Sequence, residues 1–89
     1  MSDTEKVLSE RGDEYGKFID NSTIAQDLKR IVHNQFGWEA ADSDQQEAMD
    51  MICSKLSRLL NGNVNHVDSW VDIAGYATLV ADRLKGNEL

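Results

Sequence analysis

Acidic and aromatic side chains recur at helical spacing in the segment DSWVDIAGYATLV, residues 68–80. Asp68, Asp72 and Tyr76 follow one another at intervals of four residues, so on a helix they lie along one stripe. Carboxylates on such a stripe can hold Mg²⁺ or accept hydrogen bonds from a sugar. Gly75 costs a helix about 1 kcal/mol relative to alanine, which predicts a close neighbour at that position. The structural alternative is that Asp68 caps the helix, Asp72 is solvated and Gly75 admits another helix.

A second cluster, in QEAMDMICSKLSR (residues 46–58), combines both signs of charge. Glu47, Lys55 and Arg58 lie along one predicted helical stripe, with Asp50 close by. If this stripe faces the two aspartates described above, its cations can bind phosphate oxygens in a shared pocket. The same groups can equally form interhelical ion pairs, each worth less than about 1 kcal/mol. The spacing leaves both interpretations open.

The segment ERGDEYGKF, residues 10–18, can close such a pocket. Gly16 allows the backbone to approach a ligand, Tyr15 can stack on a base, and Lys17 can reach a phosphate. The segment lacks the phosphate-loop pattern that ends in Gly-Lys-Ser/Thr. The alternative is a turn in which Tyr15 and Phe18 simply pack inward.

Four helices would position these groups. The apolar spacing predicts helices over residues 2–11, 22 to about 34, about 44–60, and from a cap at 65 or 68 to 85. Two residue pairs have the spacing of a capping box: Thr23 with Gln26, and Ser43 with Gln46. Gly62 is expected to end the third helix in the left-handed conformation.

Each predicted helix carries an apolar stripe that is expected to face a common core. The stripes consist of Val7 and Leu8; Ile24, Leu28 and Ile31; Ala48, Ile52, Leu56 and Leu59; and Trp70, Ile73, Ala77, Val80 and Leu84. The chain has no proline and short connections between these stripes. We therefore expect an all-α fold: a small antiparallel four-helix bundle with a short first helix and three longer ones. It would form one domain over residues 1–89, which a homodimer can complete.

The composition restricts the partners. The 89 residues carry a net charge of −7, so no basic surface is available to bind duplex nucleic acid. No apolar run approaches the roughly 20 residues of a membrane span. The N-terminal segment is polar, and Cys53 is the only cysteine, which is typical of a protein in a reducing cytoplasm.

Four segments carry a resemblance to a known group: VLSERGDEYGKF, IAQDLK, QEAMDMICSKLSRLLNG and DSWVDIAGYATLVADRL. Together they resemble a family of small, functionally unnamed proteins of tailed phages and prophages, over roughly residues 7 to 84. The Tyr15-Gly16 turn, the Lys55…Arg58 helix and the segment 68–76 are also similar to phage domains associated with nucleotide modification. These resemblances imply a protein of the host-cell cytoplasm that handles nucleotides.

The chain has a more distant similarity to the all-α nucleoside triphosphate pyrophosphohydrolases of MazG type. That family binds Mg²⁺ through EExxE on one helix and ExxD on the next. Here QEAMD (residues 46–50) and SWVD (residues 69–72) stand at those places, so Gln46 and Ser69 replace two carboxylates. The resemblance implies that Glu47, Asp50 and Asp72 can bind Mg²⁺. Efficient hydrolysis needs more carboxylates, which leaves open whether the protein is an enzyme.

Residues and resemblance together predict a phage accessory protein that binds a nucleotide or a related phosphorylated small molecule. Lys55 and Arg58 would hold phosphate, the aspartates at 68 and 72 would take Mg²⁺ or ribose, and Tyr15 and Tyr76 would line the base. The alternative is an acidic phage protein that inhibits a host protein, with the polar stripe purely structural. In that case Trp38 and the acidic segments 2–5 and 39–44 would form the interface.

Overall fold

The computed structural model describes residues 3–87, and every regular element in that range is an α-helix. The helices are α1 (Asp3–Tyr15), α2 (Phe18–His33), α3 (Phe36–Ala40), α4 (Ser43–Asn61) and α5 (Val67–Leu84). The predicted all-α class is therefore confirmed. Over the described residues, none of these helices combines the length and the apolar character that crossing a membrane demands.

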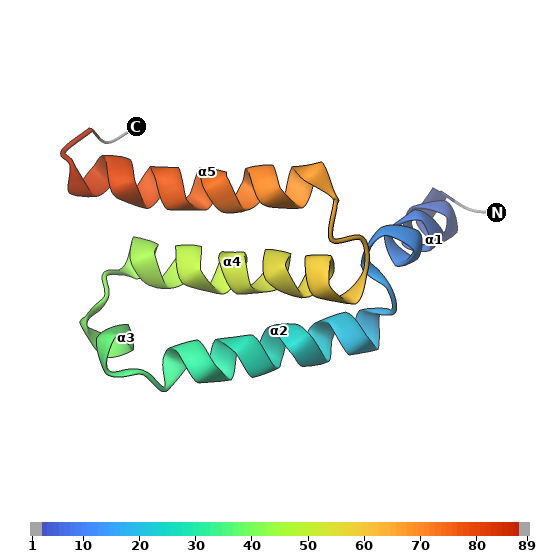
Figure 1. Ribbon diagram of the computed structural model, residues 1–89, viewed down its shortest axis with the longest axis horizontal. Helices are drawn as coiled ribbons and strands as arrows, with labels where there is room; N and C mark the ends of the chain where they lie inside the picture. Colours follow the sequence, from blue (N-terminus) through green and yellow to red (C-terminus); the bar gives the residue numbers. More distant parts are fainter. Residues whose placement is uncertain (1–2, 88–89) are drawn as a thin grey trace.

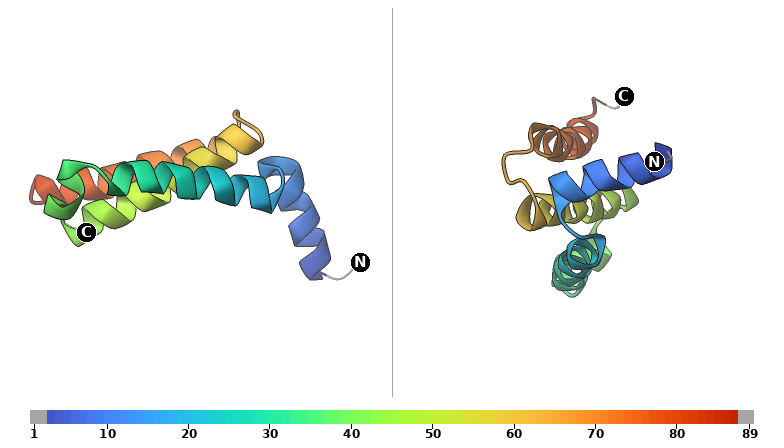
Figure 2. Two further views of the ribbon diagram at one scale, coloured as in Figure 1. Left: turned by 90° about the horizontal axis from the view of Figure 1, so that it is seen from below. Right: turned by 90° about the vertical axis from the view of Figure 1, so that its right-hand side faces the viewer.

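The three long helices lie side by side in a single layer, with α4 between α2 and α5 (Figure 1). The end-on view in Figure 2 shows the three in a row, with α1 projecting from the layer at one end. The short α3 connects α2 to α4 at the opposite end. The predicted four-helix bundle is thus not confirmed, because α4 separates its two neighbours instead of enclosing a core with them.

The break between the first two helices lies later than the sequence predicted. The first helix continues through Gly12 to Tyr15 and ends at Gly16, which has a positive φ of 75°. Helix α2 then begins at Phe18, so Thr23 lies inside the helix and its hydroxyl donates to the carbonyl of Ile19. The capping box predicted at Thr23 was therefore wrong, because the chain turns earlier, at Gly16, where a glycine adopts the left-handed conformation without strain.

The ends of α4 agree with the prediction to within one residue. Its capping box uses Asp42, whose backbone N–H donates to the side chain of Gln45 at 2.7 Å, and not the predicted Ser43. Gln46 instead donates to the carbonyl of Trp38, which ties α3 to α4. At the other end Gly62 has φ −138°, so the predicted left-handed conformation was wrong.

The last helix begins at Val67 with His66 as the cap residue, which makes no side-chain capping bond. Asp68 therefore lies in the first turn and is not the cap that the sequence predicted. Its negative charge still stabilises the helix, because it lies near the positive end of the helix dipole. The helix ends at Leu84, one residue short of the prediction.

Few apolar side chains are buried. Among the described residues only Ala25, Ala48, Cys53 and Leu59 are apolar and buried. The predicted inward stripe of α5 is largely exposed: Trp70 is 51% and Leu84 60% accessible. Val7 and Leu8 of α1, also expected to face inward, are exposed as well. Ala48 and Leu59 of the predicted α4 stripe are buried between neighbouring helices, whereas much of the other stripes stays exposed because a single layer has no second layer to cover it.

Candidate functional site

The end of α1 is fixed against the end of α4 by a close contact between two glycine segments. A Cβ on Gly62 would collide with the backbone of Glu14 and Tyr15, and one on Gly16 would collide with Asn61. The Asn61 side-chain amide donates to the carbonyls of Tyr15 at 2.9 Å and Lys17 at 3.1 Å. The first bond satisfies a carbonyl at the C-terminus of α1, and the second reaches the cap residue of α2, whose carbonyl also accepts the N–H of Asn21. We call this contact the α1–α4 joint.

The joint holds Tyr15 among three polar groups. The Arg58 guanidinium lies over the Tyr15 ring, 4.9 Å from its centroid, in the geometry of a cation–π contact. The His66 ring meets Tyr15 edge-on, with centroids 5.4 Å apart. The Glu14 carboxylate oxygen Oε2 lies 4.0 Å from Nε2 of this histidine. Residues from α1, α4 and the loop before α5 therefore converge here.

An open hollow of about 250 Å³ lies beside the joint. It is lined by Leu8, Arg11, Gly12, Tyr15, Gly16, Phe18, Asn21 and Arg58. Three residues that the sequence predicted as ligand-binding, Tyr15, Gly16 and Arg58, meet at this hollow. Two arginines on one small hollow are notable in a chain of net charge −7. We call it the arginine hollow.

The arginine hollow also contains residues that the sequence analysis did not select. Arg11 lies four residues before Tyr15 in α1, so the two share one side of the helix. The predicted end of that helix near Gly12 obscured this relationship. Asn21 accepts a hydrogen bond of 2.6 Å from the buried Ser57, which links α2 to α4 at the base of the hollow.

Lys55 and Asp72 pair directly with each other, with Nζ and Oδ2 2.9 Å apart. The lysine side chain is only 13% accessible, whereas the aspartate is 47% accessible. This contact is the interhelical ion pair that the sequence left open beside a ligand pocket. Tyr76 and Asp72 line a shallow depression on α5, distinct from the arginine hollow. The prediction of a close neighbour at Gly75 was wrong, because nothing lies within 4 Å of a Cβ placed there.

The four carboxylates proposed for Mg²⁺ are dispersed. Asp50 contacts His33 at 2.6 Å, and the His33 ring in turn stacks on Trp38. Glu47 is exposed on α4, and Asp68 is exposed at the start of α5. Within residues 3–87, no three side chains of the acidic, histidine or cysteine type gather in a way that could hold a metal ion. The four carboxylates therefore do not form one shared cluster in this arrangement.

A network at the start of α4 connects it to the end of α5. Arg83 donates to Asp42 at 2.8 Å and to Asp44 at 2.7 Å. The hydrogen bond from Arg83 is the largest influence on Asp44 and lowers the pKa of that carboxyl from its ordinary 3.8. The same bonds raise the pKa of Arg83. This network holds the N-terminus of α4 against the end of α5, and none of its residues lines the arginine hollow.

The Asp44 pKa predicts an acid-dependent loss of stability. Because the folded pKa is lower than the unfolded one, the contribution is fully present above the unfolded pKa and is lost as pH falls through the folded pKa. Urea unfolding should therefore show Asp44→Asn less stable than the wild type near about pH 6, and the difference should shrink as the pH falls below the ordinary pKa of 3.8. Asp13→Asn removes the same charge from an exposed position of α1, outside the Arg83 network. Its difference in stability from the wild type should therefore not change with pH in this way. A difference for Asp44→Asn that stays constant over this pH range would contradict the assignment.

A family model matches residues 2–84, and its description is a domain of unknown function, DUF6378. Since the match covers nearly the whole chain, the protein belongs to this family. No match was found among curated proteins or among solved structures. The family description states no activity, so the function has to be argued from the geometry of the site.

Proposed function

We propose that this protein binds a nucleotide or a related phosphorylated small molecule in the arginine hollow. The observation that carries the proposal is the pair of arginines, Arg11 and Arg58, on one concave surface of an acidic chain. Guanidinium groups are the preferred protein ligands of phosphate because their planar donors match its oxygens. An acidic surface elsewhere would repel phosphates, so an anion would concentrate at this position.

Different side chains of the hollow would contact different parts of the ligand. Arg58 lies on the face of Tyr15, and this packing orients the guanidinium while its N–H groups stay available to phosphate oxygens. Tyr15 supplies an aromatic surface beside which a base can lie. Gly16 keeps the backbone free of a side chain at the edge of the hollow.

The size of the hollow limits what it can enclose. Its volume of about 250 Å³ lies below the roughly 300–1,000 Å³ of sites that enclose a drug-sized ligand. It suits the phosphates of a nucleotide, with the base extending across the open side. Lys55 lies one helical turn before Arg58 on α4 and can take a further phosphate oxygen by exchanging its contact with Asp72.

Binding is favoured over hydrolysis. Any Mg²⁺ would arrive with the nucleotide, because within residues 3–87 no three acidic, histidine or cysteine side chains gather to hold one. Asp72 reaches the proposed site only through its ion pair with Lys55, and Tyr76 lines a separate depression on α5. We place this activity in the cytoplasm of a phage host, where the protein would bind nucleotides for phage metabolism or sequester a nucleotide signal.

The host-protein alternative depends on Trp38 and the acidic segment 39–44. Trp38 stacks on His33, and Asp42 and Asp44 bind Arg83, so these groups already have partners within the chain. A stoichiometric host protein recovered by pull-down, and lost on charge reversal at Glu39 and Asp42, would favour that alternative.

Arg58→Ala is expected to weaken nucleotide binding about 10- to 100-fold, the usual loss for a charge-assisted hydrogen bond. A ¹⁵N–¹H NMR titration with pooled nucleotides, with and without Mg²⁺, measures the affinity and locates the site. Arg30→Ala removes the same charge from an exposed ion pair with Asp27 and should bind as the wild type does. Equal weakening by both variants would indicate a general charge effect. Wild-type spectra that do not change with nucleotide would refute the proposal.

A further inference from the structure

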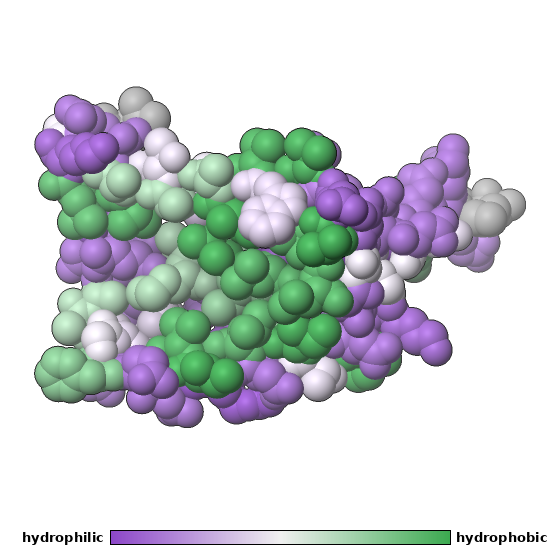
Figure 3. All heavy atoms as spheres, viewed as in Figure 1, coloured by the Kyte–Doolittle hydropathy of each residue, from purple (hydrophilic) through white to green (hydrophobic). Residues whose placement is uncertain are grey.

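One side of the helical layer is apolar and uncovered. Figure 3 shows apolar residues across α2, α4 and α5, with hydrophilic residues at the edges. On α4, Leu56 lies nine residues after Glu47, which places the two about 180° apart on the helix. Leu56 and the exposed members of the predicted stripes of α2 and α5 lie on this side, whereas Ala48 and Leu59 of the predicted α4 stripe are buried within the layer. We call it the apolar face; its large exposed members are Ile31, Leu60, Trp70 and Leu84.

The accessible surface shows how much is left uncovered. The chain exposes 6399 Å², whereas a folded monomer of 10.0 kDa exposes about 5,200 Å². The radius of gyration is 15.0 Å, compared with about 12 Å for a compact domain of this length. The excess area of roughly 1,200 Å², to which the projecting α1 also contributes, is of the same order as the roughly 800 Å² that each partner buries in a typical stable complex.

We propose that the apolar face binds a second copy of this chain, so that two layers pack face to face into a six-helix dimer. A twofold axis through the middle of α4 would set the two central helices against each other, with α2 and α5 on the flanks. The charge distribution permits this pairing. The centre of the face is apolar in Figure 3, so two chains of net charge −7 would keep their like charges at the rim.

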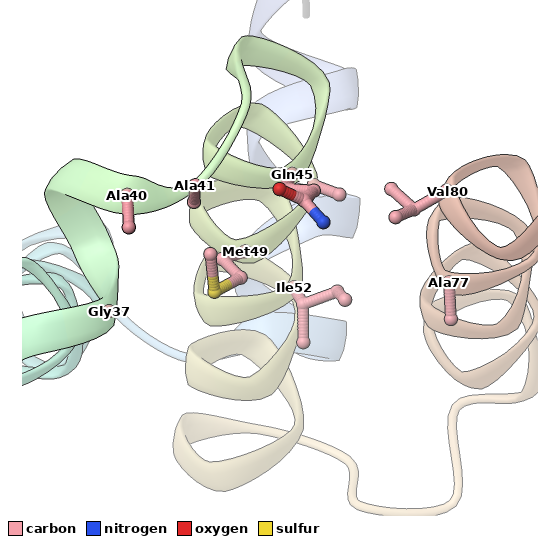
Figure 4. Close-up of a pocket in the computed structure, with 9 residues that line it drawn as sticks. Gly37, Ala40, Ala41, Gln45, Met49, Ile52, Ala77 and Val80 are labelled. Atoms are coloured by element: carbon pink, nitrogen blue, oxygen red, sulfur yellow. The ribbon is translucent and has the colours of Figure 1, made fainter. Parts of the chain in front are cut away.

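The face also has a depression that can receive side chains of the partner. An apolar hollow of about 490 Å³ lies between α4 and α5, beside α3. Figure 4 shows Met49 and Ile52 on one side of it and Ala77 and Val80 on the other. The small side chain of Ala77 leaves room for a large one from the second copy. Such filling restores the close packing that a single layer lacks.

The dimer and the arginine hollow are independent of each other. In Figure 2, α1 projects from the layer on the side opposite the face seen in Figure 3. The hollow lies beside α1, so face-to-face pairing would leave both copies of it open. A failed nucleotide titration would leave the dimer proposal intact, and the reverse also holds.

Light scattering and sedimentation of the purified chain test the proposal. Interfaces of this size have dissociation constants from micromolar downward, so at about 100 μM the wild type should have twice the chain mass of 10.0 kDa. Ile31→Glu places a charge in the interface and should raise the dissociation constant at least about 10-fold. Ile19→Glu is the matched control: the same helix, the same change and similar exposure, 68% against 62%, but about 120° away around the helix.

A second matched pair protects the test against a variant that fails to fold. Leu84 and Val71 on α5 are both 60% exposed, and only Leu84 lies on the apolar face. Leu84→Glu should therefore dissociate the dimer, whereas Val71→Glu should not, and circular dichroism should show helical content unchanged in both. A wild type that stays monomeric at about 100 μM would overturn the proposal. A dimer that Ile19→Glu and Val71→Glu disrupt, and the other pair does not, would overturn it as well.

Discussion

Gly62→Ala is expected to release α1 from the end of α4. The added Cβ would collide with the backbone of Glu14 and Tyr15, which cannot rotate away as a side chain can. Overpacking of this kind costs about 1–3 kcal/mol, which is roughly 5- to 150-fold in the equilibrium between docked and released α1. We expect α1 to move and α4 to stay in place, because α1 has no buried residue, whereas α4 packs against both α2 and α5.

Amide hydrogen exchange measures this release directly. Protection in residues 12–16 should fall in Gly62→Ala by the factor given above, and nucleotide affinity should fall with it, because Tyr15 leaves the arginine hollow. Gly75→Ala is the matched control: no atom lies near its new Cβ, and alanine should stabilise α5 by about 0.5–1 kcal/mol. Unchanged exchange in Gly62→Ala would contradict the geometry of the joint.

Asn61→Asp is expected to destabilise the same joint by electrostatics instead of by volume. The Asn61 amide donates to two carbonyl oxygens, of Tyr15 and Lys17. A carboxylate at this position has no donor and would face both oxygens, close to the negative end of α4. Loss of two hydrogen bonds at about 1 kcal/mol each, together with this repulsion, gives an expected loss of about 2–4 kcal/mol.

This effect carries its own pH signature. The introduced carboxyl would have a raised folded pKa, because its neutral form can donate one hydrogen bond to a carbonyl. The stability deficit against the wild type should therefore be largest at neutral pH and should narrow as pH falls below about 5. Asn65→Asp makes the same change in the exposed loop before α5, and its stability should stay within about 0.5 kcal/mol of the wild type. A deficit for Asn61→Asp that does not depend on pH would show that charge is not its cause.

Several features of the fold followed from local patterns alone. The apolar spacing of residues 44–60 and 68–84 was strong enough to place α4 and α5 almost to the residue. Helical spacing and capping are decided by neighbours within about four positions, which a single sequence displays in full. The break near residue 16 was harder, because two glycines compete for it. Gly16 and not Gly12 ends the helix because only Gly16 meets Asn61.

The candidate site was predictable only in part. Tyr15, Gly16 and Arg58 could be selected as chemical groups, but Arg11 entered only when α1 proved to continue past Gly12. Lys55 and Asp72 could be placed on facing helices, and the sequence left open whether they would pair or share a ligand. Their contact at 2.9 Å depends on how α4 and α5 align, which no local pattern specifies.

The class of fold, the identity of the apolar stripes and the strongly acidic charge were all readable from the order of residues. How the helices assemble was not. An apolar stripe indicates that a surface is buried, but it does not identify the element that buries it, because the hydrophobic effect is non-directional. Much of the three stripes turned to one side of a layer, while Ala48 and Leu59 became buried within it, since α4 packs on both neighbours through its two flanks. That arrangement leaves the apolar face open and sets the arginine hollow on the other side, a division that only contacts between distant segments can produce.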